Sequence, residues 1–254
     1  MNPSAANQSD DFSFDITQYI QSKQIGKGGF GVVYQVIDKR TNQIYAAKIS
    51  LQEVDFESHK LIRELKREVN ILAMVRFASI LSFVGFSPTD FEGKPNPVII
   101  TEYLPNGSLD KVIELSNKGL SIDGWDTTRR LINLYGIASG MSFLHSNGIV
   151  HRDLKTENVF VDEYLFPKIG DFGLSKMITN KSSTDVKSTT GIKGTLTYIS
   201  PEIFEKSEYS PAGDVYAFAF IIYEVMTDEK LLTDLPLLPF LNQVVYHSYR
   251  PELK

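Results

Sequence analysis

The chain has 254 residues, of which 42% are hydrophobic and 22% charged, and its 26 lysines and arginines against 31 aspartates and glutamates give a net charge of −5. This is the composition of a globular protein with one large domain or two lobes, and its acidic balance argues against a nucleic-acid-binding surface. The absence of cysteine excludes disulfides, thiolate catalysis and cysteine-ligated zinc, and the four histidines lack the spacing of a metal site.

The first 15 residues are polar and acidic, which predicts a disordered tail without a secretory signal. The longest apolar stretch is Val215–Met226, and its 12 residues are too few to cross a bilayer. We therefore expect this stretch to form a buried core helix, and we expect a cytoplasmic protein with no membrane insertion.

Short β-branched and aromatic runs begin at Ile16 and predict a strand-rich region. Strands are expected at 32–37 and 44–49, and strand-like runs follow at 80–86 and 97–104. Between these two groups, apolar residues at helical spacing predict a helix over 57–76.

Beyond residue 104 the pattern becomes helical. Apolar residues recur at helical spacing over 131–144, and the pair Asn147-Gly148 is typical of a helix end. Strands followed by helices indicate an α+β chain whose two halves segregate. We place the boundary at residue 104, which gives a tail at 1–15, a strand-rich half at 16–104 and a helical half at 105–254.

A glycine-rich segment lies just before the strand at 32–37. Residues 25–33 read IGKGGFGVV and fit G-x-G-x-x-G-x-V. Glycine-rich turns are common, so the pattern by itself is equally compatible with a simple turn. A dinucleotide-binding fingerprint would continue into a helix, whereas a β-branched strand follows here. The glycines are therefore expected at a hairpin tip, where backbone N–H groups can approach phosphate oxygens.

Lys48 ends the second strand in apolar surroundings, and by itself it is compatible with a surface lysine whose stem covers apolar side chains. Glu68 lies on the apolar side of the predicted helix, where a carboxylate needs a cationic partner. Lys48 is the available partner for Glu68, and Glu64, one helical turn earlier, is the rival carboxylate.

The strongest motif is HRDLKTEN at 151–158, with DFG beginning at Asp171, 18 residues after Asp153. A solvated loop is the simplest explanation of so many polar residues. However, all five specified positions of H-R-D-L-x-x-x-N match, and this pair of motifs is typical of phosphoryl transfer to proteins.

Seven motifs occur in a fixed order: IGKGGFGVV, AAK, REVNIL, HRDLKTEN, DFG, GTLTYISPE and DVYAFAF. With them the chain resembles the eukaryotic protein kinases over about residues 20–254. ITEYLPNGSL and RPEL are most similar to the tyrosine-kinase-like branch of the serine/threonine kinases. The resemblance implies an α+β, bilobal fold with a five-stranded antiparallel sheet and one helix in the first lobe, a mainly helical second lobe, and ATP as the cofactor between them.

The resemblance also implies which residues bind ATP. They are Ile25, Gly26, Gly28 and Gly31 over the phosphates, Val33 and Ala46 against the adenine ring, Thr101 as the gatekeeper, and Glu102 and Leu104 in the hinge. Lys48 would orient the α- and β-phosphates while Glu68 holds it in place.

For the reaction itself, the resemblance implies that Asn158 and Asp171 ligate Mg²⁺. Asp153 would accept or orient the proton of the substrate hydroxyl, and Lys155 would neutralise charge on the γ-phosphate. A lysine at this position is typical of kinases that act on serine and threonine of protein substrates. A small-molecule kinase is disfavoured by GTLTYISPE and by the long, hydroxyl-rich segment before it.

Residues 174–199 correspond to the activation segment, and Thr195 within it would shape the acceptor pocket. Its many hydroxyls suit a flexible polar loop. An upstream activating kinase is a possible partner, since phosphate on one of Ser188, Thr189 or Thr190 would pair with Arg152. Asp214 is expected to cap the backbone of the HRDLKTEN loop; it could also be a simple helix N-cap, and both roles can hold together.

The chain ends at Lys254, before about two helices and an arginine that the family resemblance would place after it. We therefore expect a second lobe that lacks its last helices. This leaves one alternative to an active serine/threonine kinase, namely a weak or inactive ATP-binding scaffold of the same fold.

Overall fold

The computed structural model describes residues 14–28, 31–51, 69–120, 122–172, 176–177, 196–206, 209–231, 239, 241–247 and 249. The chain divides into two compact units. The first comprises Met1–Arg76 and Leu81–Leu104, and the second comprises Phe77–Ile80 and Pro105–Lys254.

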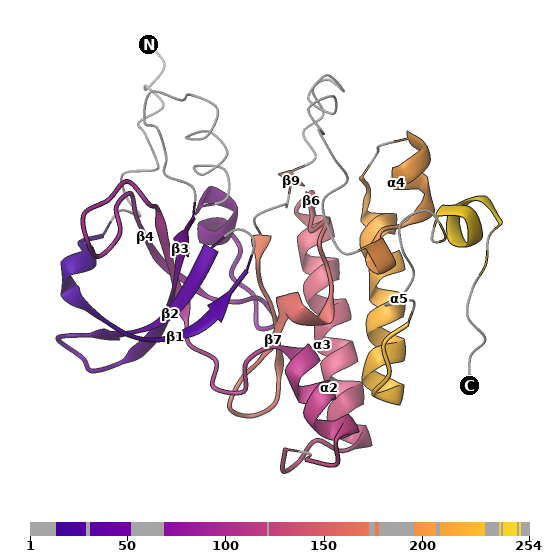
Figure 1. Ribbon diagram of the computed structural model, residues 1–254, viewed down its shortest axis with the longest axis horizontal. Helices are drawn as coiled ribbons and strands as arrows, with labels where there is room; N and C mark the ends of the chain where they lie inside the picture. The colour runs from indigo at the N-terminus through magenta and orange to yellow at the C-terminus, as the bar shows by residue number, and fades with distance from the viewer. Residues whose placement is uncertain are drawn as a thin grey trace. The chain divides into compact units, whose positions relative to one another are not determined.

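The first unit is built on a five-stranded antiparallel sheet in the order β1-β2-β3-β5-β4 (Figure 1). Its strands are β1 (Tyr19–Lys27), β2 (Gly31–Asp38), β3 (Ile44–Ser50), β4 (Phe83–Ser87) and β5 (Val98–Glu102). The strands predicted at 32–37 and 44–49 are confirmed, and so is the antiparallel five-stranded sheet. β4 begins three residues later than the run at 80–86, because Ile80 belongs to the second unit, where it bridges Ile169.

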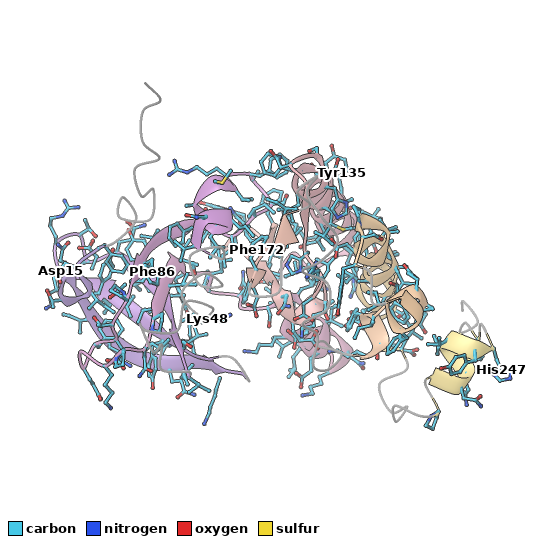
Figure 2. The ribbon with its side chains drawn as sticks, turned by 90° about the horizontal axis from the view of Figure 1, so that it is seen from above. Asp15, Lys48, Phe86, Tyr135, Phe172 and His247 are labelled. Atoms are coloured by element: carbon cyan, nitrogen blue, oxygen red, sulfur yellow. The ribbon has the colours of Figure 1, made fainter. Side chains whose placement is uncertain are left out.

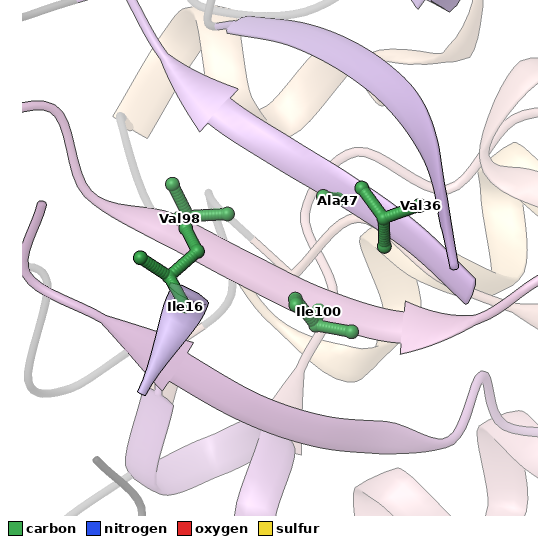
Figure 3. Packing of buried hydrophobic residues seen from close by; sticks show 5 residues of the cluster. All are labelled: Ile16, Val36, Ala47, Val98 and Ile100. Atoms are coloured by element: carbon green, nitrogen blue, oxygen red, sulfur yellow. The ribbon is translucent and has the colours of Figure 1, made fainter. Parts of the chain in front are cut away.

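One face of this sheet carries a core of Ile16, Val36, Ala47, Val98 and Ile100 (Figure 3). Ile16 opens the short helix η2 (Ile16–Gln18), which lies before the first strand. Asp15 caps this helix by accepting a hydrogen bond from the Thr17 amide at 2.9 Å. The residues just before β1 are therefore part of the folded core rather than of a tail.

Phe14 also packs against this apolar core of the sheet. Its amide donates to the Phe86 carbonyl at 3.1 Å, and its ring meets Tyr19 edge-on at 5.4 Å. A Cβ atom on Gly85 would overlap the Phe14 ring, so the glycine provides the space in which that ring packs.

The predicted helix at 57–76 is described only from residue 69, and it is helical to residue 74. Val69 and Leu72, which belong to the predicted apolar side, are buried at 3% and 5% exposure. Glu64 and Glu68 lie outside the described residues, so the pairing of Lys48 with either of them stays a prediction.

The second unit is mainly helical. Its helices are α2 (Leu109–Asn117), α3 (Thr127–Ser146), η3 (Thr156–Asn158), η6 (Leu196–Tyr198), α4 (Pro201–Lys206), α5 (Pro211–Thr227) and η7 (Leu241–Tyr246). Two small antiparallel sheets accompany them: β6 (Ile149–Val150) pairs with β9 (Lys176–Met177), and β7 (Val159–Val161) pairs with β8 (Pro167–Ile169).

Helix α3 ends where the sequence predicts, with Asn147 as its C-cap and Gly148 at φ 71°. Its N-cap is Asp126, whose carboxylate accepts from the Arg129 amide at 2.8 Å. Leu131 was expected on the buried side but is 54% exposed, because it shares the outer side of the helix with Tyr135, which projects away from α3 (Figure 2).

Helix α5 begins at Pro211, four residues before the predicted apolar stretch, with Ser210 as its N-cap. The stretch forms a helix and places Phe220, Ile221 and Val225 in the core, as expected. Its first and last residues, Val215 and Met226, are 56% and 44% exposed. The helix ends at Asp228, which adopts a left-handed conformation with φ 60°.

A charged clamp holds this end of α5. The Arg130 guanidinium donates to both carboxylate oxygens of Asp228, at 2.7 and 2.8 Å, and also to the Ser116 hydroxyl at 2.8 Å. The Arg130 and Asp228 side chains are only 14% and 21% exposed. Because α2, α3 and the end of α5 each contribute one of these residues, the clamp fixes three helices together.

Among the residues that the structure describes, no helix has the length and apolar character needed to span a membrane.

Candidate active site

One face of the first unit's sheet carries five of the predicted ATP-binding residues. The register pairs Gly26 with Val33, Val33 with Lys48, and Ala46 with Thr101. Directly paired residues point to the same face of a sheet, and residues two apart on one strand share that face. All five residues therefore lie on one face, and the apolar core shown in Figure 3 lies on the other.

Gly28, which follows β1, and Gly31, which begins β2, differ in what surrounds them. The Gly28 amide donates to the Gly31 carbonyl at 2.9 Å. A Cβ atom on Gly31 would lie 2.6 Å from the Ile49 carbonyl oxygen, whereas one on Gly28 would have no described atom within 4 Å. Packing therefore requires a glycine at position 31 but leaves room for a side chain at position 28.

Local structure differs among the predicted loop and hinge residues near the ends of these strands. Ile25 lies where the pairing register shifts between Gln24 and Gly26. At the end of β5, the Glu102 amide donates to the Ser82 carbonyl at 3.0 Å, and the Glu102 carboxylate accepts from the Ser82 amide at 2.7 Å. Leu104 follows two residues later, outside the strand and half-buried.

In the second unit, a small hairpin brings Asn158 next to Asp171. β7 and β8 pair Val159 with Ile169, so the residues just outside the hairpin, Asn158 and Gly170, lie opposite each other. The Gly170 amide donates to the Asn158 carbonyl at 2.8 Å, and Asp171 is the next residue. The two predicted magnesium ligands are therefore held at one end of a hairpin although 13 positions separate them in sequence.

Asn158 also belongs to a cluster of side chains within the loop, centred on Asp153. Its amide nitrogen donates to the Asp153 carbonyl at 2.7 Å and to the Asp153 carboxylate at 2.9 Å. The Lys155 ammonium lies 3.1 Å from the same carboxylate oxygen. The Asp153 and Lys155 side chains are 12% and 18% exposed, so this cluster is shielded but reachable from solvent.

His151 joins this loop to the segment that carries Asp171. It is fully buried, its Nε2 lies 3.0 Å from the Gly170 carbonyl, and its ring lies 5.2 Å from that of Phe172. A carbonyl only accepts, so Nε2 carries the proton and Nδ1 is left to accept the Asp153 amide at 3.4 Å. Phe172 can be found in Figure 2 and is itself only 1% exposed.

Asp214 supports the same loop from α5. Its carboxylate accepts from the amides of His151 and Arg152, at 2.8 and 2.9 Å, and lies 2.8 Å from His145 Nε2. Burial alone would raise the pKa of Asp214, but the hydrogen bonds from the His145 ring and from the amides of His151 and Arg152 hold it below its usual value. The predicted contact with the loop backbone is confirmed, and the simple N-cap is wrong because Ser210 occupies that position.

Two residues of this region have left-handed backbone conformations, Arg152 at φ 71° and Asp171 at φ 57°. Such a conformation costs a non-glycine residue about 1–2 kcal/mol. The Arg152 amide recovers part of this cost through its bond to Asp214. Strained residues beside shielded carboxylates are typical of functional sites, because the surrounding structure must hold them in place.

A sequence model described as the protein kinase domain matches residues 19–236, which is most of the chain. The chain belongs to the protein kinase family. The match covers both units, including the sheet face of the first and the loop at 151–158 of the second.

Several similar proteins with curated descriptions are plant receptor-like kinases. The chain is 32% identical over 216 residues to cysteine-rich receptor-like protein kinase 41 of Arabidopsis thaliana, covering 84% of this chain and 30% of that protein. It is 34% identical over 215 residues to cysteine-rich receptor-like protein kinase 6 of Oryza sativa subsp. japonica, covering 84% and 29%. The chain therefore spans under a third of the length of these two relatives.

A protein kinase domain uses ATP and a divalent metal, and the second unit has suitable metal donors. Because the Asn158 amide nitrogen donates to Asp153, its Oδ1 remains as the acceptor that a cation can use. No group of three or more histidine, cysteine or carboxylate side chains forms a metal cluster within the described ranges. Mg²⁺ commonly takes only one or two protein oxygens, with water and phosphate supplying the rest, so Asn158 and Asp171 suit it.

Sequence reasoning missed a buried group behind this loop, formed by Thr156, Tyr198 and Glu224. Glu224 is 1% exposed and accepts hydrogen bonds from the hydroxyls of both other residues. The available signal was a single carboxylate inside the apolar stretch at 215–226, since a buried charge requires polar partners. Thr195, Ser188, Thr189 and Thr190, for which roles were predicted, lie outside the described residues.

Proposed function

We propose that the chain is a Mg·ATP-dependent protein serine/threonine kinase, which transfers the γ-phosphate of ATP to a hydroxyl of a protein substrate. The observation that carries this proposal is the cluster of Asp153, Lys155 and Asn158, together with the hairpin that holds Asp171 beside Asn158. Phosphoryl transfer needs positioning and charge neutralisation more than covalent chemistry by the protein, and these side chains are suited to both tasks.

The first unit would supply the nucleotide-binding groups. Gly28 would bring backbone N–H groups close to the phosphates, Lys48 would neutralise them, and Val33 and Ala46 would contact the adenine ring. The face shared by Val33, Ala46 and Lys48 supports the assignment, because a ligand lying along that face could contact all three.

The second unit would supply the chemistry. Mg²⁺ held by Asn158 and Asp171 would neutralise phosphate charge. Asp153 would orient the substrate hydroxyl and take its proton as the new oxygen–phosphorus bond forms and the bond to ADP breaks. Lys155, beside Asp153, would offset charge on the moving phosphoryl group. A lysine at this position supports serine and threonine as acceptors.

We further propose that a phosphate on Ser188, Thr189 or Thr190 activates the kinase by pairing with Arg152. Arg152 stacks over the Tyr209 ring at 4.7 Å and adjoins the reactive Asp153. If this proposal is correct, the triple alanine variant loses most of its activity, whereas undiminished transfer by that variant would exclude it.

The test is a transfer assay with radiolabelled Mg·ATP and generic protein substrates, followed by analysis of the phosphorylated amino acids. We expect phosphoserine and phosphothreonine from the wild type. Asp153→Asn should abolish transfer and leave the Kd for ATP within about twofold, because it removes a contact made to the reacting hydroxyl. Binding of ATP by the wild type without any transfer would instead support a scaffold function.

A further inference from the structure

Behind the reactive loop, three buried side chains form a closed set of hydrogen bonds. Glu224 Oε2 accepts from the Thr156 hydroxyl at 2.7 Å, and Glu224 Oε1 accepts from the Tyr198 hydroxyl at 2.6 Å. The two hydroxyl oxygens lie 3.4 Å apart. Thr156 is fully buried. An apolar side chain at this position would therefore leave the Glu224 carboxylate without one of its two hydrogen-bond donors.

The energetics of this group make each donor matter. Burial raises the pKa of Glu224, and the hydroxyls of Tyr198 and Thr156 act against that rise by stabilising the charged form. Burial, and then the charge of Glu224, raise the pKa of Tyr198, which keeps its phenol protonated as a donor. The ammonium of Lys230 pairs at 2.7 Å with Glu157, the neighbour of Thr156, so a second contact holds the same part of the loop.

The position of Thr156 connects this buried group to the reactive side chains of the loop. It lies directly after Lys155 and two residues before Asn158, and both of these contact the Asp153 carboxylate. The beginning of the loop is held by Asp214, which lies about 15 Å from Glu224 along the axis of α5. The loop is therefore fixed at both ends by buried carboxylates of one helix.

We propose that Thr156 is a positioning residue, which links Lys155 and Asn158 to Tyr198 through the carboxylate of Glu224. Tyr198 ends η6, so the link joins the reactive loop to the segment at 196–200, which directly follows Thr195, the residue predicted to shape the acceptor pocket. Thr156 touches neither ATP nor the acceptor in this proposal. Its hydroxyl holds the loop in the geometry that transfer needs, and the proposal rests on the kinase function proposed above.

The test compares Thr156→Val, which keeps the shape but removes the hydroxyl, with Thr156→Ser, which keeps the hydroxyl. Thr128→Val is the matched control, because Thr128 lies exposed in the first turn of α3. We expect Thr156→Val to lower kcat about tenfold, since small misplacements of reacting groups cost this much or more. The KM for ATP should stay within about twofold, and Thr156→Ser and Thr128→Val should resemble the wild type.

Hydrogen exchange provides a readout that does not need activity. The Asn158 amide donates to the Lys155 carbonyl at 3.0 Å, across the turn that Thr156 opens. Thr156→Val should speed exchange of this amide about tenfold relative to the wild type and to Thr128→Val. If the wild type transfers no phosphate, the proposed function fails, and the exchange comparison still decides the role of Thr156.

Three results would overturn the proposal. The first is unchanged kcat in Thr156→Val. The second is an equal loss in Thr156→Ser, which would show that the hydroxyl is not the active group. The third is a lower kcat with unchanged exchange at Asn158, because then the loop has not moved.

Discussion

Alanine substitutions in the loop between β1 and β2 should separate the glycine that the fold needs from the glycine that the nucleotide needs. At Gly31 the new Cβ atom would lie 2.6 Å from the Ile49 carbonyl oxygen and 3.4 Å from Lys48 Cγ. The first distance is too short for a carbon–oxygen contact, and the oxygen belongs to the paired strand, so β2 and β3 must move apart. Overpacking of this kind costs about 1–3 kcal/mol.

At Gly28 the same change meets no described atom within 4 Å, and at Gly26 the nearest is Val33 Cβ at 3.6 Å, an ordinary contact. Gly28→Ala should therefore keep the stability of the wild type or raise it by about 0.4–1 kcal/mol through the unfolded state. If the loop backbone binds phosphate, however, the methyl group would occupy space that the ligand needs.

Gly31→Ala should thus change the thermal stability, and Gly28→Ala should change the affinity for ATP. A loss of about 2 kcal/mol in Gly31→Ala would lower Tm by roughly 4–8 °C in scanning calorimetry. Gly28→Ala should keep its Tm but bind ATP roughly ten- to a hundredfold more weakly by titration calorimetry, which is the value of one charge-assisted hydrogen bond. Wild-type affinity for ATP in Gly28→Ala would refute the assignment of this loop to phosphate binding.

Three further changes test the second unit. Asp214 has a lowered pKa in the folded protein, so its ionised carboxylate stabilises the fold above about pH 4. This stabilisation is lost as the pH falls through the pKa of Asp214 in the folded protein. The Tm of the wild type should therefore fall more steeply below about pH 4 than the Tm of Asp214→Asn. Arg130→Met leaves Asp228 without its bidentate partner and should cost about 3–5 kcal/mol in urea unfolding, and a loss under about 1 kcal/mol would mean that the clamp contributes little. Asn158→Leu removes an oxygen donor and should abolish magnesium-dependent transfer while leaving the fold intact by circular dichroism; retained transfer at ordinary magnesium concentrations would exclude Asn158 as a ligand.

Local pattern was sufficient to predict elements whose signals lie within a few residues. Strands β2 and β3 follow from β-branched runs bounded by turns, and the end of α3 follows from Asn147 and Gly148. The start of α3 and the burial of its sides were less readable, because a helix carries apolar residues such as Leu131 on its outer side without penalty. Likewise, the run at 80–86 looks like one strand, although Ile80 and β4 belong to different units.

The candidate site shows the same division. The family resemblance carried by HRDLKTEN and DFG predicted Asp153, Asn158 and Asp171 as site residues, and the hairpin β7–β8 explains why the last two lie together. The supporting contacts of Thr156 and Glu224 join segments 68 positions apart, and no spacing within the sequence encodes such a pairing. A carboxylate in an apolar stretch predicts that hydrogen-bond donors lie nearby, but only the folded structure shows which residues they are.

The packing of Phe14 on Gly85 has a practical consequence for anyone who shortens this protein. The kinase match begins at residue 19, so a fragment trimmed to that match would lose both Phe14 and Ile16. Part of the apolar cover over Val98 and Ile100 would then be missing. Such a fragment should be harder to express in soluble form than one that begins a few residues before Phe14.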